Sequence, residues 1–324
     1  MTGPRRLMAG AALLAAVWCG AASGADFQFG VIGHSFKSGA DETVLTEAIR
    51  QANQASLAFV VATGIKAASE SCNDKLYNQR KELFNASSGP LVVSLAASDW
   101  SACRNSAGRS DAVERLIRIR EVFFSDSTSL GGNPIGLTRL SATASFRSYA
   151  ENAHWEFGNV LFATINLPAN NNHYLSAAGR NSEFEDRLVA NRAWIKRLFL
   201  MAQRRQLAGL VLFSDGNVGV HAEESRWLPS FSTKEDGFAG PRRQIKALAA
   251  KFPGQVLLVD TQALSPSGKA GQAPIVWHEN LGHVSVTANW IEVHVAAPAA
   301  GSRKSAPLFS ISGGGPGTPG IQRR

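Results

Sequence analysis

The feature of this sequence that most constrains its fold is an alternation of short apolar runs with segments of helical period. Residues 27–33, for example, form an apolar run that ends in a polar turn, and apolar residues recur at helical spacing from Asp41 onward. Such alternation predicts buried strands joined by helices, the pattern of an α/β fold. We expect strands over 27–33, 57–63, 91–96, 159–167, 208–213 and 255–260, and helices over 41–55, 74–84, 111–124, 182–205 and 241–252.

Two of the helical segments carry more detailed predictions. Asp41 is a suitable N-cap for the first helix. In the helix over 111–124, Asp111 and Glu114 have the spacing of a capping box. The period of that helix predicts apolar residues facing the core and arginines facing solvent, with Val113, Leu116, Ile117 and Phe123 inward and Arg115 and Arg118 outward.

The remaining segments bound the domain. Residues 125–152 are irregular and rich in Ser, Gly and Thr, which predicts a long excursion over the fold. Residues 284–286 and 290–295 alternate in polarity and are expected to be antiparallel strands. From Ser312 the chain is dominated by Gly and Pro and is expected to be disordered. The predicted organisation is a leader over 1–25, one domain over 26–311 and a tail over 312–324.

The first 25 residues have the layout of a secretory signal. Arg5 and Arg6 precede an apolar core that is too short to span a bilayer, and small residues lead to Ala25, the expected cleavage site. The bulky Trp18 before Cys19 argues against a lipoprotein. We therefore expect an exported protein, periplasmic or secreted, with no transmembrane segment in its mature part.

Charge and cysteine content restrict the partners and the compartment. At 44% hydrophobic and 18% charged residues, the chain has the composition of a globular protein. Removal of residues 1–25 takes away Arg5 and Arg6 and no acidic residue, so the net charge falls from +8 to +6. The basic residues form no run with interleaved aromatics, so we expect no nucleic-acid partner. Export would leave two cysteines, and an oxidising compartment predicts that Cys72 and Cys103 form a disulfide.

Polar residues follow several of the predicted strands. In open α/β folds the carboxyl ends of the strands collect the reactive groups, so the loops there hold the candidate site residues. Lys37, Lys66 and Arg104 would suit an anionic ligand. The candidates at these strand ends are His34, Lys37, Gly64, Ile65, Lys66, Ala97, Ser98, Asp99, Asn166, Asp215 and Asp260.

Three familiar motifs are absent from this sequence. Gly30 and Gly33 follow a strand but lack the third glycine or the Gly-Lys-Ser/Thr of a phosphate loop. His278 and His283 are five residues apart, whereas a zinc-protease helix needs a spacing of four. There is also no Gly-x-Ser-x-Gly elbow. Nucleotide, zinc and serine-nucleophile sites therefore have no motif to support them.

Several segments together resemble an exported branch of the calcineurin-like metallophosphoesterases. The resemblance runs from about Phe27 to Ile311. It implies a four-layer α/β-β/α sandwich, in which two mixed sheets are flanked by helices and hold two divalent metals at the strand ends. It rests on Phe29–Gly33, Phe59–Val61 with Ile65-Lys66, Cys72–Asp74, Asp99–Cys103, Arg118–Phe124, Asn170–Asn172 and Asn289–His294.

The metal-ligand motifs of that family are largely missing here. The family's Gly-Asp becomes Gly33-His34, and its Gly-Asp-Ile-Lys becomes Gly64-Ile65-Lys66, without the aspartate that would bridge both metals. The stretch that resembles Gly-Asp-Asn-Glu-Trp is Ala96–Trp100. The later Gly-Asp-Thr-His ends instead in Gln262.

These departures predict a pseudoenzyme rather than a hydrolase. Two dications close together repel strongly unless an anion lies between them, so loss of the bridging aspartate should remove the dinuclear centre. We expect no cofactor and a role in binding an anionic ligand or a protein partner at the strand ends. Two alternatives stay open: a phosphoester hydrolase with an altered or single-metal site, using Mn or Fe, and an envelope structural protein whose cleft is plugged by apolar side chains.

Overall fold

The computed structural model of the chain describes residues 25–36, 39–176, 181–218, 236–262, 272, 274–297 and 307–313. The predicted secretory signal lies outside these residues except for Ala25. Lys37, one of the candidate site residues, is also outside them, as is most of the predicted tail. Ser312 and Gly313, the first tail residues, belong to the last strand, so the folded domain extends to Gly313.

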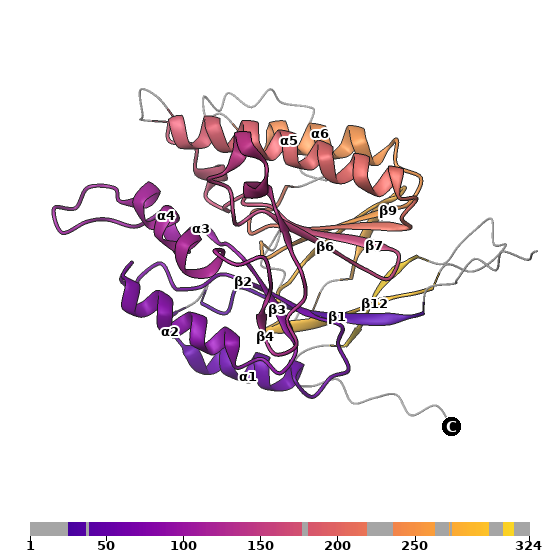
Figure 1. The fold of residues 1–324 in the computed structure, drawn as a ribbon, viewed down its shortest axis with the longest axis horizontal. Helices are drawn as coiled ribbons and strands as arrows, with labels where there is room; N and C mark the ends of the chain where they lie inside the picture. The colour runs from indigo at the N-terminus through magenta and orange to yellow at the C-terminus, as the bar shows by residue number, and fades with distance from the viewer. Residues whose placement is uncertain are drawn as a thin grey trace, which may run out of the picture.

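The described strands form two mixed sheets, of six and seven strands (Figure 1). The first sheet has the order β13-β12-β1-β2-β3-β4, in which β1, β2 and β3 are parallel and the other strands antiparallel to their neighbours. Its strands are β1 (Phe27–Ile32), β2 (Val60–Thr63), β3 (Pro90–Ser94), β4 (Leu130–Gly131), β12 (Trp290–Val295) and β13 (Phe309–Gly313).

The second sheet has the order β10-β11-β9-β8-β7-β6-β5, with a parallel centre of β7, β8, β9 and β11. Antiparallel pairs at both edges complete it. Its strands are β5 (Thr138–Arg139), β6 (Ala153–Phe157), β7 (Val160–Thr164), β8 (Gly209–Phe213), β9 (Gln255–Asp260), β10 (Val276–His278) and β11 (Leu281–Ser285).

Helices cover the outer face of each sheet, which gives four layers (Figure 1). The first sheet packs against α1 (Glu42–Ala52), α2 (Asp74–Asn85) and α4 (Ala112–Phe123). The second packs against α5 (Ser182–Arg204) and α6 (Ala239–Ala249). The predicted α/β-β/α sandwich of two mixed sheets flanked by helices is therefore confirmed. Four short helices lie in connections: α3 (Ala97–Trp100), η1 (Leu140–Ala142), η2 (Ala144–Phe146) and η3 (Asn171–His173).

Aromatic rings fill the space between the two sheets. Phe29 and Phe59 of the first sheet stack with ring centroids 5.4 Å apart, and both meet Phe162 of the second sheet edge to face. Edge-to-face and offset-stacked rings are the favoured arrangements of aromatic pairs. This shared aromatic core holds the two sheets face to face, and so fixes where the loops at their strand ends meet.

The prediction of which α4 residues face the core was partly wrong. Val113 and Ile117, expected in the core, are 50% and 49% exposed. Leu116 and Phe123 are buried as predicted, but the rest of the buried stripe lies on the side of the helix away from Val113 and Ile117. Asp111 is the N-cap, but its side chain makes no capping bond and pairs instead with Arg115, which is largely buried. The buried residues are Ala112, Leu116, Ile119, Val122 and Phe123.

The last two predicted strands are both present. Residues 281–285 and 290–295 do form β11 and β12, but the two strands lie in different sheets. β12 is antiparallel to β1 and β13, as predicted, whereas β11 is antiparallel to β10 but parallel to β9. The alternation of polarity gives the face of a strand but not its partner. The sequence also missed β6, β10 and the short strands β4 and β5 within residues 125–152.

A buried histidine in β6 should make stability depend on pH. Both ring nitrogens of His154 are buried without a hydrogen-bond partner, and the ring lies against Trp194. Burial, with smaller contributions from Arg197 and Arg205, lowers its pKa to about 4. The unfolded chain therefore takes up a proton below about pH 6.5 that the folded chain refuses, and stability is lost as pH falls from 6.5 towards 4.

We predict that His154→Phe, which keeps an aromatic ring in place, removes this acid sensitivity. Urea unfolding at pH 7 and pH 5 should show the wild type losing about 1–2 kcal/mol more than the variant at the lower pH. Comparison of the two proteins at each pH cancels the contributions of other groups. An equal loss in both proteins, or the same effect from substitution of the exposed His278 by Gln, would contradict the assignment.

Candidate functional site

The loops at the carboxyl ends of strands from both sheets meet at one edge of the sandwich. His34, Gly64 and Ser98 follow β1, β2 and β3 of the first sheet. Asp215 and Asp260 lie at the ends of β8 and β9 of the second. Direct hydrogen bonds connect the two sets of loops, so the structure brings the predicted strand-end residues into one region.

The imidazole of His34 occupies the space beside Gly64. A Cβ atom added to Gly64 would lie 2.0 Å from Cδ2 of His34. Gly64 also has a φ of +83°, which favours glycine. Nε2 of His34 and Oγ of Ser98 are hydrogen-bonded at 3.0 Å. His34 is thus held between Gly64 and Ser98, and no side chain at position 64 could coexist with it in this position.

The carboxylate of Asp99 is fully buried and surrounded by backbone donors. Oδ1 accepts hydrogen bonds from the N–H groups of Ile65 at 2.7 Å and Lys66 at 3.2 Å, and Oδ2 accepts from Ala96 at 2.7 Å. Burial raises the pKa of Asp99 to about 6, against the opposing effects of His34 and these N–H groups. Asp99 therefore holds the ends of β2 and β3 together.

Lys66 does not face a ligand at this edge, although the sequence offered it as an anion contact. Its side chain is buried, and the ammonium donates to the carbonyls of Ala67 at 2.7 Å and Ser98 at 3.0 Å. Burial lowers its pKa. Arg104 is exposed and donates to the Gly108 carbonyl of its own loop. The long side chain of a lysine can place its ammonium either at the surface or inside the protein, and sequence alone does not distinguish the two positions.

The carboxylate of Asp215 joins the two sheets. Oδ2 accepts from the N–H of Ala97, in the first sheet's loop, at 2.7 Å and from the N–H of Ala169, after β7, at 2.9 Å. Oδ1 accepts from the Thr261 hydroxyl at 3.0 Å and from the Gln262 amide at 3.4 Å. Both oxygens of this buried carboxylate are thus occupied by donors of the chain itself.

Asp260 is also hydrogen-bonded through both of its oxygens. Oδ2 lies 2.7 Å from Nε2 of His283, and Oδ1 accepts from the Ser285 hydroxyl at 2.7 Å and the Gln262 N–H at 2.9 Å. Asp260 and His283 are both buried. The strands β9 and β11 are neighbours in the second sheet, so this cluster ties their ends together.

Asn166 lies in the connection after β7 and forms hydrogen bonds with several neighbouring segments. Its Nδ2 donates to Glu151 at 3.0 Å, and its N–H donates to Asn152 at 2.8 Å. Its carbonyl accepts from Arg187 and Asn191 of α5. The contacts of Asn166 therefore link β7 to α5 and to the segment before β6.

A strained loop beside this edge depends on an arginine that the sequence analysis missed. Asn171, Asn172 and His173 all have a left-handed backbone, with φ of 54°, 53° and 55°. Such conformations cost free energy unless their surroundings hold them. The fully buried Arg187 of α5 donates to the side chain and the carbonyl of Asn172, and Asn172 donates to Gly237. The sequence feature that could have identified Arg187 is its position four residues after Glu183, which is its ion-pair partner.

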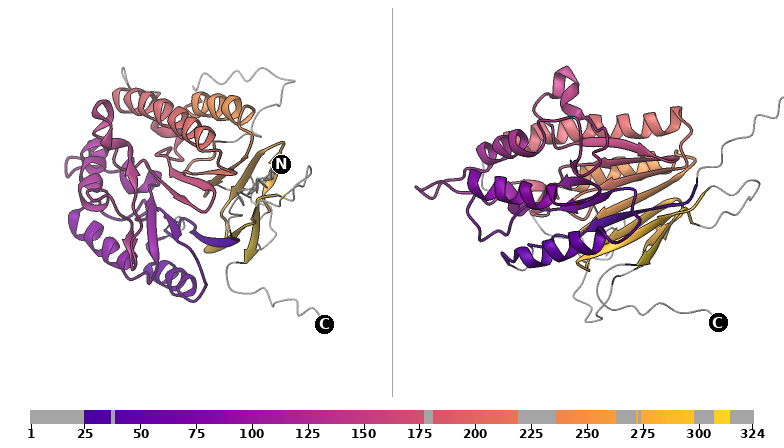
Figure 2. Two further views of the ribbon diagram at one scale, coloured as in Figure 1. Left: turned by 45° about the vertical axis from the view of Figure 1, so that its right-hand side comes forward. Right: turned by 60° about the horizontal axis from the view of Figure 1, so that its bottom comes forward.

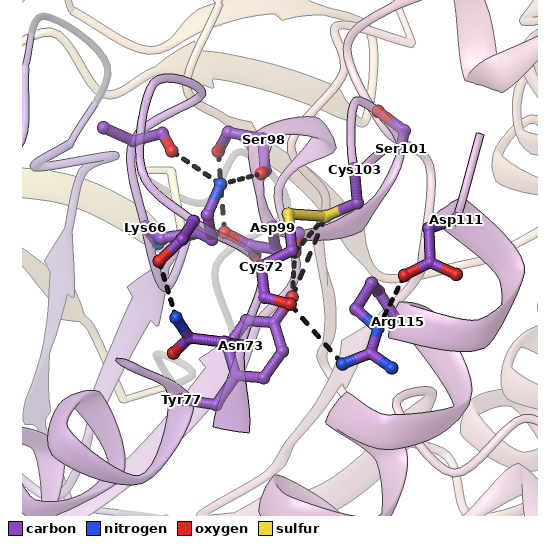
Figure 3. The surroundings of a disulfide bond; sticks show 12 residues. Lys66, Cys72, Asn73, Tyr77, Ser98, Asp99, Ser101, Cys103, Asp111 and Arg115 are labelled. Carbon is purple, nitrogen blue, oxygen red and sulfur yellow. Dashed lines mark hydrogen bonds and ion pairs between the residues drawn. A yellow bond between two sulfur atoms is a disulfide. The ribbon is translucent and has the colours of Figure 1, made fainter. Parts of the chain in front are cut away.

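A disulfide lies next to Asp99, as predicted (Figure 3). Cys72 and Cys103 are bonded with their Cα atoms 5.9 Å apart. The Tyr77 hydroxyl donates to the carbonyl of Asp99 at 3.0 Å, and Arg115 donates to the carbonyl of Cys72 at 3.4 Å. The disulfide thus fixes the start of α2 to the turn after α3, next to the buried carboxylate.

The residues at this edge do not fit a dinuclear metal centre. Among the residues that the structure describes, no three His, Cys, Asp or Glu side chains gather so that they could hold a metal ion. Asp99, Asp215 and Asp260 have their oxygens engaged by the chain. His34 shares its Nε2 with Ser98, and Gly64 supplies no carboxylate between two metals.

Comparisons with known proteins add little at the level of sequence. No family model and no curated protein matches the chain. Among solved structures, the chain is similar to a crystal structure described as that of a novel phosphatase from Mycoplasma pneumoniae, with a TM-score of 0.40 and 11% identity. The match covers 81% of this chain and 72% of that one. Because this TM-score is below 0.5, the architecture rests on the strand order and core described above.

The contact between His34 and Gly64 can be tested by a double-mutant cycle. We predict that Gly64→Ala destabilises the protein by about 2–4 kcal/mol, because the new methyl group overlaps the imidazole and the backbone is left-handed. Adding His34→Ala should recover at least about 1 kcal/mol in denaturant unfolding.

Gly108→Ala is the matched control for this cycle. Gly108 has a φ of +74° but no atom within 4 Å of an added Cβ, so the variant measures backbone strain alone. If Gly64→Ala cost no more than Gly108→Ala, or if removal of His34 recovered nothing, the imidazole would not fill this space.

The disulfide should be present in the purified protein and should stabilise it. The two cysteines are 31 residues apart, so replacing both by alanine should lower the free energy of unfolding by about 3–4 kcal/mol. Alkylation of the denatured, unreduced protein followed by peptide mass spectrometry should find both residues unmodified. Alkylated Cys72 and Cys103 would rule the disulfide out.

Proposed function

We propose that this chain is an exported pseudoenzyme of the calcineurin-like phosphoesterase type, which binds a ligand or protein partner and does not hydrolyse phosphoesters. The observation that carries the proposal is the state of the three buried carboxylates at the strand-end edge. Asp99, Asp215 and Asp260 each accept hydrogen bonds from backbone or side-chain donors of the chain on both oxygens.

The energetic cost of metal binding supports this proposal. A metal that took both oxygens of Asp215 would leave the N–H groups of Ala97 and Ala169 without acceptors, at about 1–3 kcal/mol for each buried group. Asp99 would release three such groups. A second dication would also lack a bridging anion, since neither Gly64 nor Ile65 carries a carboxylate.

The same contacts give the edge a structural role. Asp215 connects loops of the two sheets, Asp99 connects β2 to β3, and Asp260 connects β9 to β11 through His283. The three carboxylates are hydrogen-bonded on both oxygens, and satisfied bonds of this kind rigidify a buried polar cluster. The edge would then present fixed loops to a partner, as binding sites on rigid scaffolds do. An anionic ligand would depend on cations other than Lys66, because Lys66 is engaged internally.

Export is the second part of the proposal. It rests on the layout of residues 1–25 and on the disulfide between Cys72 and Cys103, which persists in oxidising compartments. No helix in the described parts of the chain is both long enough and apolar enough to cross a membrane.

Metal analysis and phosphoesterase assays test the proposal directly. We predict that the purified protein contains metal far below one ion per chain, and that Mn²⁺ or Fe²⁺ elicits no hydrolysis of phosphomonoesters or phosphodiesters above the protein-free rate. Asp215→Asn and the exposed Asp126→Asn serve as a matched pair. Stoichiometric metal, with metal-dependent turnover that Asp215→Asn abolishes and Asp126→Asn preserves, would establish a hydrolase with an altered metal site instead.

A further inference from the structure

The outer layer formed by α5 and α6 has an unusual distribution of charge. Neither the chain from Leu188 to Arg205 nor that from Ala239 to Lys251 contains an Asp or a Glu. The acidic residues of α5 are confined to its first turns. Over the same two stretches the basic residues are Arg192, Lys196, Arg197, Arg204, Arg205, Arg242, Arg243, Lys246 and Lys251.

The opposite helical layer, α1 with α2 and α4, is built differently. There the exposed and half-buried arginines are paired with carboxylates, as Arg50 is with Glu47 and Arg118 with Asp74. On α5 and α6, Arg192, Lys196 and Arg243 are exposed and form no ion pair or side-chain hydrogen bond with any residue that the structure describes. The α5/α6 face therefore carries three unpaired cations, although its Arg205 and Arg242 do pair with Glu156 and Asp236.

Three of these cations gather in one groove. The helices α5 and α6 lie side by side on the second sheet (Figures 1 and 2). The amide of Gln244 in α6 donates to the carbonyl of Arg192 in α5 at 2.8 Å, which fixes the two helices relative to each other. Arg192 and Lys196 from α5 and Arg243 from α6 then line the groove between them. Their proximity is set by rigid elements rather than by a loop.

Exposed apolar side chains lie among these cations. Val189 is 62% exposed and Leu200 is 39% exposed. Val189, Lys196 and Leu200 are spaced by seven and four residues, so they follow one stripe of α5. Val189 lines the same groove as Arg192 and Lys196. An exposed stripe that mixes valine and leucine with unpaired lysine and arginine is the pattern of a helix that lies in a membrane interface.

We propose that the α5/α6 face binds the surface of a bilayer that contains anionic lipids. Arg192, Lys196 and Arg243 contact the headgroups, and Val189 and Leu200 enter the boundary with the acyl chains. The sign of the charge complements an anionic surface, and the apolar side chains gain free energy only where water is excluded. A nucleic acid would use the cations but offers nothing to Val189 and Leu200. This binding is separate from the strand-end edge and does not depend on the absence of hydrolysis.

Sedimentation with vesicles tests the proposal. The purified protein should bind vesicles of phosphatidylglycerol and phosphatidylcholine but not vesicles of phosphatidylcholine alone, and 1 M NaCl should weaken the binding. The triple variant Arg192→Gln, Lys196→Gln, Arg243→Gln should bind about 100-fold more weakly, because each cation near an anionic surface contributes about fivefold. The matched control, Arg50→Gln, Lys75→Gln, Arg109→Gln, removes the same charge from elsewhere and should bind like the wild type.

A second variant separates lipid from other polyanions. Val189→Gln with Leu200→Gln should weaken vesicle binding about tenfold or more. The same pair should leave any binding to double-stranded DNA or heparin unchanged. Equal binding to neutral and anionic vesicles, an equal loss in the control triple variant, or no effect of the apolar pair would each overturn the proposal. Circular dichroism of every variant should match the wild type, which shows that a loss of binding is not a loss of fold.

Discussion

The hydrogen bonds to the carboxylate of Asp215 are the interaction on which the arrangement of the strand-end edge depends. A buried carboxylate is costly unless donors surround it, and here those donors come from loops of both sheets. Ala97 follows a strand of the first sheet, and Ala169 follows a strand of the second. The anion therefore fixes the position of one sheet's loops against the other's at the point where this architecture would place its chemistry.

The neighbouring groups extend the same arrangement. Asp99 accepts hydrogen bonds from three backbone N–H groups next to the disulfide, and Asp260 is held by His283 and Ser285. His34 fills the space that a side chain at Gly64 would need. In each case a polar side chain at the edge forms its hydrogen bonds with other groups of the same chain. The edge is better understood as a joint between two sheets than as a set of unoccupied metal ligands.

Much of the fold could be predicted from the sequence because its signals are local. The helical period and the capping residue Asp41 located α1, and the number of cysteines predicted the disulfide. The phase of α4 failed because two apolar residues, Val113 and Ile117, lie outside the buried stripe. Alternation of polarity did not predict the partners of β11 and β12, because strand partners are chosen by the tertiary fold.

The site was less predictable for a related reason. The sequence predicted which residues follow the strands, but it could not predict which oxygens of their carboxylates accept hydrogen bonds from the chain itself. The partner of Asp215 at Ala97 lies 118 residues away along the chain, and His283 lies 23 residues from Asp260. Lys66 was predicted to contact an anion because lysine is positively charged. In the structure its ammonium donates hydrogen bonds to two backbone carbonyls instead. Such contacts are set by packing between distant segments and leave no local pattern.

Amide hydrogen exchange at Ala97 and Ala169 tests the central claim most directly, because these two N–H groups donate to Asp215. They should be protected in the metal-free protein, and excess Mn²⁺ or Zn²⁺ should leave their exchange rates unchanged, as measured by mass spectrometry. Rapid exchange without metal, or acceleration of these two amides when metal is added, would show that the carboxylate is available as a ligand and would contradict the account.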